Sequence, residues 1–150
     1  MNLLSRRTVL AVAAVVDISL NSKENPVAAK ALAVRHKLPP RHLETLLQGL
    51  VHAKILKGVR GPRGGYQLAR EDHLVSVGDI ARVADELSTA DPADMSSHSK
   101  LLGAIIEPKI HEVGKPFLKS LNELSIEDLR HLAEKAHLEE KTPAHALAAE

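Results

Sequence analysis

The sequence of 150 residues predicts a mainly α-helical fold that includes one small β-wing, an antiparallel hairpin. Apolar residues recur at steps of three and four along most of the chain, which is the period of an α-helix. The stretch "ILKGVRGPRGGYQLAR" departs from this period, because apolar and polar residues alternate on both sides of a glycine-rich turn. Apolar residues make up 44% of the chain but only Tyr66 and Phe117 are aromatic, so the core must consist of packed aliphatic side chains.

Three helices are expected before the hairpin. The first covers about residues 4–20, and its apolar positions follow the helical period: Val9, Val12, Ala13, Val16 and Leu20. The second begins with Asn25 as N-cap and Pro26 in the first turn, and it continues to about His36. The third begins near Pro40 and places four leucines on one face: Leu43, Leu46, Leu47 and Leu50.

The hairpin is expected to pair a strand over about residues 56–60 with a strand over about 65–69. Pro62 suits the second position of the connecting turn, because its ring fixes φ at the value that this position requires. Gly64 and Gly65 can adopt positive φ at little cost.

Two further helices are expected to begin with the same kind of cap, Ser76 with Asp79 and Ser125 with Asp128. Between these helices the steps of an apolar seam come close to a heptad repeat: Leu102, Ile106, Ile110, Val113, Phe117, Leu121 and Leu124. Two prolines at positions 108 and 116 interrupt the seam, and an interior proline predicts a kink or a break in the helix.

Charge is distributed very unevenly along the chain. Residues 1–70 contain twelve Lys and Arg against three Asp and Glu, whereas residues 71–150 contain eight against sixteen. The two parts therefore carry formal charges of +9 and −8, which give the overall value of +1. A basic N-terminal part favours a polyanionic partner, and an acidic C-terminal part favours a different role.

The composition also excludes several kinds of site. The chain has no cysteine, which excludes disulfides, zinc–thiolate sites and cysteine-ligated iron–sulfur clusters. No apolar stretch reaches about 18 residues, so no membrane span is expected. The nine histidines form no recognised metal motif, and an acidic solvated loop explains Asp91, Asp94 and His98 better than a metal site does. No catalytic constellation stands out, so we expect neither an enzyme nor a cofactor.

Three helices followed by a hairpin are the order of a winged helix-turn-helix domain. In such a domain the third helix enters the major groove of DNA, and arginines on the wing reach phosphates or the minor groove. The residues assigned to DNA contact are Arg6, Arg7, Arg41, His42, Glu44, Thr45, Gln48, Lys57, Arg60, Arg63, Gly64 and Gly65. An ordinary solvated helix face and a plain basic turn remain the alternatives.

The segment "LPPRHLETLLQGLVHAKILKGVRGPRGGYQLAR" resembles the signature of the Rrf-type winged-helix regulators, the bacterial group that includes IscR, NsrR, RirA and CymR. The resemblance covers about residues 3–137 and implies a homodimer on a pseudo-palindromic operator, with Glu44 and Arg60 facing DNA. Many members hold an iron–sulfur cluster on three cysteines before the dimerisation helix. The matching residues 88–106 contain none, so this chain is expected to be a cysteine-free member.

These observations predict a DNA-binding domain over 1–87, a loop over 88–100 without cluster ligands, dimerisation helices over 101–138 and a flexible tail over 139–150. The predicted dimer interface consists of Leu102, Ile106, Ile110, Val113, Phe117 and Leu121. The predicted function is that of a homodimeric, sequence-specific repressor in the bacterial cytoplasm, associated with the nucleoid and not with a membrane. Its signal, a small effector or a partner protein, stays open.

Two other functions compete with this prediction. A winged-helix module could bind a protein partner without recognising specific DNA, and Pro39–Pro40 at the start of the third helix favours that alternative. The stretch "SRRTVLAVAAVV" also resembles a twin-arginine export signal. Asp17 ends its apolar run after eight residues, which favours a folded first helix instead.

Overall fold

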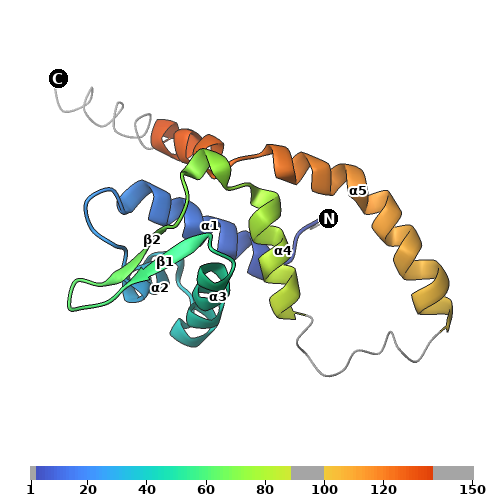
Figure 1. Ribbon diagram of the computed structural model, residues 1–150, viewed down its shortest axis with the longest axis horizontal. Helices are drawn as coiled ribbons and strands as arrows, with labels where there is room; N and C mark the ends of the chain where they lie inside the picture. The colour runs from blue at the N-terminus through green and yellow to red at the C-terminus, as the bar shows by residue number, and fades with distance from the viewer. Residues whose placement is uncertain (1–2, 89–99, 137–150) are drawn as a thin grey trace, which may run out of the picture.

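The computed structural model describes residues 3–88 and 100–136, in which a helical body carries one long projecting helix (Figure 1). The body begins with α1 (Arg6–Asn21), α2 (Ala29–His36), α3 (Pro40–His52), β1 (Leu56–Val59) and β2 (Gly65–Leu68). It continues with η1 (Asp72–Leu74), α4 (Val77–Ser88), the π-helical turn η3 (Leu102–Ile106), α5 (Glu107–Glu123) and a helix over residues 126–136. The predicted class, mainly helical with one small antiparallel sheet, is confirmed.

Several predictions concern residues that the structure does not describe. Residues 89–99 of the predicted loop, with Asp91, Asp94 and His98, lie outside the described ranges, as does the predicted tail over 139–150. Across residues 3–88 and 100–136, no helix combines the length and the apolar character that crossing a membrane requires.

α1 lies at the centre of the body and packs small side chains against its neighbours. It begins at Ser5, whose Oγ accepts a hydrogen bond from the backbone N–H of Thr8 at 3.1 Å. Its fully buried residues are Ala11, Ala14, Val15 and Ile18. The apolar positions that indicated the helical period are less buried, since Val9 is 52% exposed and Val12, Ala13, Val16 and Leu20 are half-buried. The pattern is ambiguous because α1 is apolar on two faces, and its alanines allow the closer packing.

The start of α2 also differs from the prediction. Val27 pairs with Tyr66 of β2 through two backbone hydrogen bonds of 2.8 and 2.9 Å, which extends the hairpin by an isolated bridge. This pairing holds the chain extended after Pro26, so α2 begins at Ala29 instead of at Asn25. The tertiary pairing thus prevails over the local Asn-Pro helix signal.

α3 begins where the sequence predicts. Pro39 is the N-cap and Pro40 is the first helical residue, a position where the missing N–H of proline would have no helical partner in any case. All four predicted leucines, from Leu43 to Leu50, are buried. The two prolines therefore occupy positions at which α3 can begin without losing a helical hydrogen bond.

The hairpin pairs β1 and β2 in antiparallel register from Leu56 with Leu68 to Val59 with Gly65. Two of its glycines are required by its own backbone. A Cβ at Gly64 would collide with the carbonyl oxygen of Val59, and a Cβ at Gly65 would collide with that of Val27. The close approach explains both glycines without any contact with DNA.

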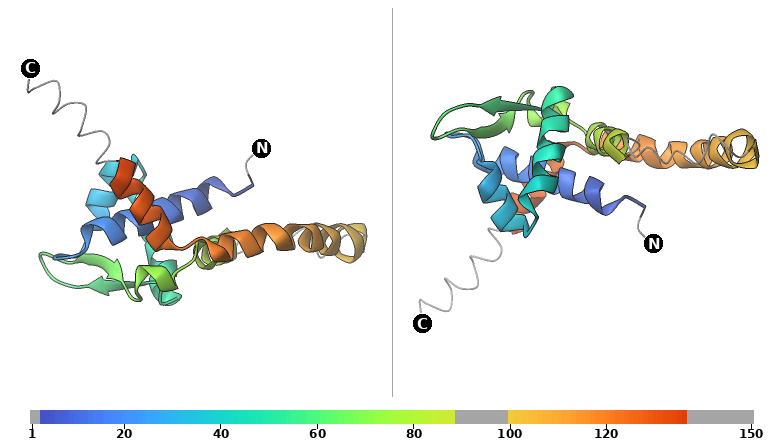
Figure 2. Two further views of the ribbon diagram at one scale, coloured as in Figure 1. Left: turned by 90° about the horizontal axis from the view of Figure 1, so that it is seen from above. Right: turned by 90° about the horizontal axis from the view of Figure 1, so that it is seen from below.

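The C-terminal helix is attached to the body at the first turn of α4 (Figure 2). Ser76 exchanges hydrogen bonds of 3.0 Å with Asp79, and Ser125 does the same with Asp128 at 2.9 and 3.1 Å, which confirms both predicted caps. The two capped segments also pair with each other. Val77 N–H donates to the carbonyl of Leu124 at 2.8 Å, and Ile126 N–H donates to that of Val75 at 2.9 Å.

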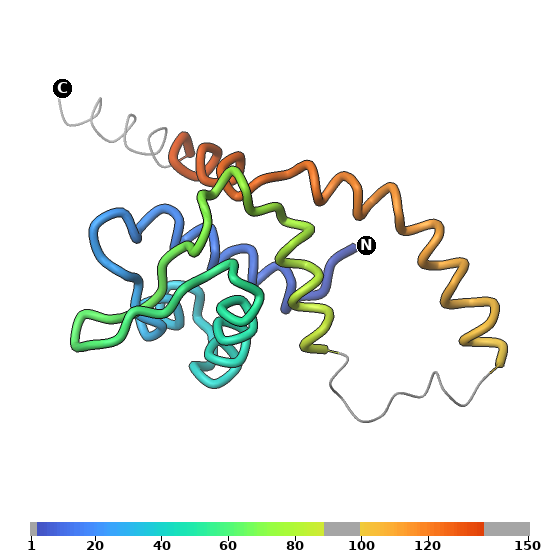
Figure 3. Tube along the Cα trace, viewed as in Figure 1, coloured from blue at the N-terminus to red at the C-terminus, as the bar shows by residue number. Residues whose placement is uncertain are grey.

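α5 runs away from this junction, and its far end has no contact with the body (Figure 3). Of the predicted kink or break, a break at Pro116 does not occur, because α5 is continuous through this residue. The π-helical turn η3 precedes Pro108, and its wider winding relieves the clash between the proline ring and the preceding turn. Near the junction, Leu121 and Phe117 pack on Val77 and Ala81 of the same chain.

A buried carboxylate joins α1 to α2. Asp17, whose side chain is only 8% exposed, accepts two hydrogen bonds from Arg35, from Nη2 at 2.7 Å and from Nε at 2.9 Å. His36 Nε2 lies 2.8 Å from Oδ2 of Asp17, and Asn21 Nδ2 donates to Oδ1 of Asp17 at 3.0 Å. Both oxygens of Asp17 are therefore satisfied, as a buried carboxylate requires.

We expect the Asp17→Ala substitution to lower the free energy of unfolding by about 2–3 kcal/mol, because it leaves the Arg35 guanidinium and the His36 ring without their acceptor. The loss stays below that of a fully buried pair, since the side chain of Arg35 is 44% exposed. Urea unfolding followed by circular dichroism measures it. Asp85→Ala, at an exposed position of α4, is the matched control and should change the value by less than about 0.5 kcal/mol. Equal effects of the two substitutions would contradict the role of the buried pair.

Candidate nucleic-acid interface

α3 presents a polar face because its leucines occupy the opposite side. The five predicted contact residues on this helix are all exposed: Arg41, His42, Glu44, Thr45 and Gln48. Thr45 Oγ1 donates to the carbonyl of Arg41 at 3.3 Å, and the residue is exposed. Arg41, Glu44 and Gln48 are of the types that form paired hydrogen bonds with guanine, cytosine and adenine in the major groove.

The hairpin adds a basic edge beside α3. Lys57, Arg60 and Arg63 are all exposed, the first on β1 and the other two in the turn at the tip. In Figure 1, α3 and the hairpin lie on the lower side of the body, whereas α5 extends from its upper side. The two elements that carry these predicted residues therefore lie on one side of the molecule.

The two arginines at the start of α1 differ from each other. Arg7 donates to the carbonyl of Leu87 and to Oγ of Ser88, both at 3.3 Å, and thus binds the C-terminal end of α4. Arg6 is exposed and makes no side-chain hydrogen bond or ion pair with residues 3–88 or 100–136. The prediction grouped the two residues because sequence alone cannot show that one of them is used inside the fold.

Ion pairing separates the arginines into two groups. Arg35, Arg82 and Arg130 each bind an aspartate: Asp17, Asp79 and Asp72 respectively. In contrast, Arg41, Arg60, Arg63 and Lys57 have no ion pair with any residue in the described ranges. The uncompensated cations of α3 and the hairpin are thus available to an anionic partner.

Lys37 is a residue that the sequence analysis did not assign to the site. It ends α2 in the left-handed conformation, with φ of 52°, and it lines the same cavity as Arg6 and His42. Glycine is the usual residue in this conformation. A lysine at the end of the second helix, two residues before Pro39–Pro40, was therefore the feature of the sequence that could have drawn attention to this position.

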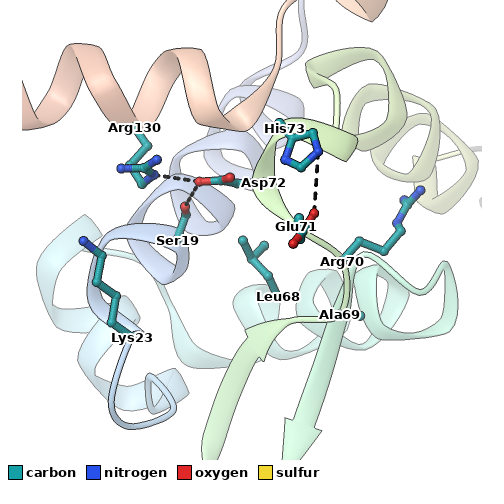
Figure 4. Close-up of a pocket in the computed structure, with 9 residues that line it drawn as sticks. All are labelled: Ser19, Lys23, Leu68, Ala69, Arg70, Glu71, Asp72, His73 and Arg130. Atoms are coloured by element: carbon teal, nitrogen blue, oxygen red, sulfur yellow. Dashed lines mark hydrogen bonds and ion pairs between the residues drawn. The ribbon is translucent and has the colours of Figure 1, made fainter.

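An open depression of about 570 Å³ lies at the base of the hairpin, between α1, η1 and the helix over residues 126–136 (Figure 4). Several of its charged groups are paired. Arg130 Nε donates to Asp72 at 2.6 Å and Nη1 donates to Glu134 at 2.9 Å, while Ser19 donates to Asp72 at 3.2 Å. This network joins three separate segments and leaves Asp72 and Arg130 little capacity for a ligand.

The network also sets the ionisation of Asp72. Burial opposes its charged form, but the hydrogen bonds from Arg130 and Ser19 and the adjacent guanidinium charge outweigh that effect. The pKa of Asp72 is therefore lowered from its ordinary value of 3.8. The carboxylate stabilises the fold above this ordinary value, and the stabilisation is lost as the pH falls through the lower pKa of the folded state.

Comparison with known proteins shows what this arrangement is similar to. The family model Rrf2, described as an iron-dependent transcriptional regulator, matches residues 4–131. The chain is 30% identical over 126 residues to slr0846 of Synechocystis sp., a protein named for an HTH-type transcriptional regulator, and the match covers 84% of this chain and 86% of that one. It is 36% identical over 76 residues to the HTH-type transcriptional regulator IscR of Vibrio cholerae, covering 51% of this chain and 44% of the relative.

Solved structures give the same result. The structure of T. potens IscR superposes with a TM-score of 0.68 at 31% identity and covers 89% of both chains. The structure of CymR, the global cysteine regulator of B. subtilis, superposes with a TM-score of 0.64 at 24% identity, covering 88% of this chain and 98% of the other. The second likeness concerns the fold alone.

We expect Asp72→Asn to lower the free energy of unfolding by about 1–2 kcal/mol at pH 7, because the amide cannot replace the charge that Arg130 binds. The difference from the unsubstituted protein should shrink below pH 4 and vanish once Asp72 is protonated in the folded state. Urea unfolding at a series of pH values measures it. Glu71→Gln, at an exposed neighbouring position, should give a small difference at every pH. A difference for Asp72→Asn that does not depend on pH would contradict the assigned ion pair.

Proposed function

Because the chain belongs to the Rrf2 family of transcriptional regulators, we propose that it is a homodimeric, sequence-specific repressor that works without an iron–sulfur cluster. Members of this family and the structural relatives are DNA-binding transcription regulators, not enzymes, and this chain is a DNA-binding transcription regulator too. The single observation that carries the finer proposal is the set of uncompensated cations on α3 and the hairpin, beside the polar face of α3.

The proposed mode of binding places α3 in the major groove and the hairpin on the adjacent backbone or minor groove. Arg41, Glu44 and Gln48 are the residues we assign to base edges, with His42 and Thr45 beside them. Lys57, Arg60, Arg63 and Arg6 are assigned to phosphates or to the minor groove. Arg7, Gly64 and Gly65 act through the fold, since each is engaged by its own chain.

The family description refers to iron, but this chain does not carry the ligands of a thiolate-bound cluster. It has no cysteine, and within residues 3–88 and 100–136 no three His, Asp or Glu side chains are arranged to hold a metal ion. We therefore derive no step of regulation from a cluster.

A dimer is favoured by the apolar face that α5 and the turn before it leave uncovered. Leu101, Ile105, Ile110 and Val113 are each 59–69% exposed, and we call these four residues the α5 stripe. An isolated helix that projects with such a stripe gains stability when a second copy covers it. The predicted interface over Leu102–Leu121 would then be shared: Ile110 and Val113 face the partner, while Phe117 and Leu121 pack on their own subunit.

A two-fold symmetric dimer would present two copies of α3 to successive major grooves of one duplex, so the proposed operator is a pseudo-palindrome. Repression follows if this operator overlaps a promoter. The proposed place of action is the nucleoid in the bacterial cytoplasm.

Selection of bound fragments from random duplexes tests the proposal directly. We expect one enriched motif with two half-sites separated by about one helical turn or a small multiple of it. On that duplex, Arg60→Ala should weaken binding about tenfold and lower the slope of log affinity against log salt by about one. Lys119→Ala removes an exposed cation of α5 and is the matched control, with affinity and slope unchanged. The absence of an enriched motif would instead favour a protein-interaction module.

The dimer has a separate test. We expect Val113→Asp to convert the protein from dimer to monomer in sedimentation equilibrium, because a charge in the α5 stripe would be buried without a partner. Leu132→Asp is the matched control, since Leu132 is 62% exposed but lies outside the stripe, on the last helix. A monomeric unsubstituted protein at micromolar concentration would overturn the proposed assembly.

A further inference from the structure

A cavity of about 330 Å³ lies between the start of α1, the turn after α2 and the first turns of α3. We call it the α1–α3 pocket. It is lined by Arg6, Arg7, Leu10, Lys37, Leu38, Pro39, His42, Leu43 and Leu46. Its volume is at the lower end of the range for small-molecule sites, which is about 300–1,000 Å³.

All the ionisable residues that line the α1–α3 pocket are basic: Arg6, Arg7, Lys37 and His42. No carboxylate lines it, which distinguishes it from the depression at the base of the hairpin, where Asp72 and Glu71 balance the cations. Arg7 is fixed by Leu87 and Ser88. The side chains of Arg6, Lys37 and His42 make no hydrogen bond or ion pair with the described part of the chain. Three basic groups around one cavity without a counter-charge favour an anion.

The floor of the same pocket is apolar. Leu43 and Leu46 are 1% and 5% exposed, and Leu10 and Leu38 are half-buried. Because Leu43 and Leu46 expose almost none of their surface, the apolar area open to a ligand comes from Leu10 and Leu38, and a phosphate group of DNA would gain nothing from these two side chains. A ligand that combines a negative charge with an apolar chain or ring would use both parts.

The backbone at Lys37 gives a second, independent observation. Its φ of 52° is in the left-handed region, where a residue other than glycine is strained. Here the conformation ends α2, as that of Lys54 follows the end of α3, and it places Lys37 at the rim of the pocket.

We propose that the α1–α3 pocket binds a small organic anion, a carboxylate with an apolar chain or ring, and that occupancy weakens DNA binding. The second part rests on the proposed function. His42 belongs to the polar face of α3 and Arg6 is assigned to phosphate contact, and both line the pocket. A bound carboxylate would neutralise these cations and thus compete with the duplex.

Three probes separate the possible sources of binding: hexanoate has charge and chain, inorganic phosphate has charge alone, and 1-hexanol has the chain alone. They are titrated into the full chain by NMR at constant ionic strength. We expect hexanoate to shift the backbone amides of residues 37–46 with a Kd on the order of 1 mM, about tenfold below that of either other probe. Lys37→Asn removes the charge with a residue that tolerates the left-handed conformation, and it should weaken hexanoate about fivefold. Lys23→Asn, in the other depression, is the matched control and should leave binding unchanged.

The outcomes decide between the readings. If phosphate binds as tightly as hexanoate, the pocket is a site for the phosphates of the DNA backbone only. If 1-hexanol binds as tightly as hexanoate, the pocket is an apolar cavity only. Either result, or no binding of any probe, overturns the proposal. If hexanoate binds, the selected duplex is titrated with and without it at constant ionic strength. About tenfold weaker DNA binding at about 10 mM hexanoate, reduced to about threefold in Lys37→Asn, supports competition, and unchanged DNA binding overturns that part alone. Since the NMR titration uses no DNA, it stands even if no operator is found.

Discussion

The arrangement of the whole molecule depends on the backbone pairing between the first turn of α4 and the first turn of the last helix. Val77 and Ile126 each donate across this junction, and the two Ser–Asp caps satisfy the neighbouring donors. Hydrogen bonds from the backbone and hydroxyl of Ser125 lower the pKa of Asp128 from its ordinary value, so the cap stays charged near neutral pH. Because α5 ends where this pairing begins, the junction sets the direction of α5 relative to α3 and the hairpin.

Electrostatic pairing divides the molecule into two parts. Where the fold needs a fixed contact between segments, an arginine is bound by an aspartate, as for Arg35 with Asp17 and Arg130 with Asp72. On α3 and the hairpin the cations have no such partner in the described part of the chain. The uneven charge of the sequence thus has a structural counterpart, since acids outnumber bases after residue 70 and several of them bind arginines away from α3.

The sequence was sufficient for the elements whose signals are local. The leucines of α3, the bounds of the two strands and both Ser–Asp caps follow from short-range patterns, and the structure has them within one or two residues. The sequence was insufficient where the local structure depends on contact with a segment that is distant along the chain. The core face of α1 depends on which neighbours approach it, the start of α2 depends on the pairing of Val27 with Tyr66, and the role of Arg7 depends on the end of α4. Lys37 was missed because its position in a cavity is a property of the assembled helices.

The widened turn at Leu102–Ile106 has a consequence for the shape of the projecting helix. One additional residue in a turn rotates everything before it by about 100° relative to a regular α-helix. In the proposed dimer the apolar column would therefore continue from Val113 and Ile110 to Ile105 and Leu101, which are among the most exposed apolar side chains, whereas the heptad count assigns Ile106 and Leu102. In the proposed dimer, two such helices would match along their full length only if both contained the same phase shift, so the turn would favour pairing between identical chains.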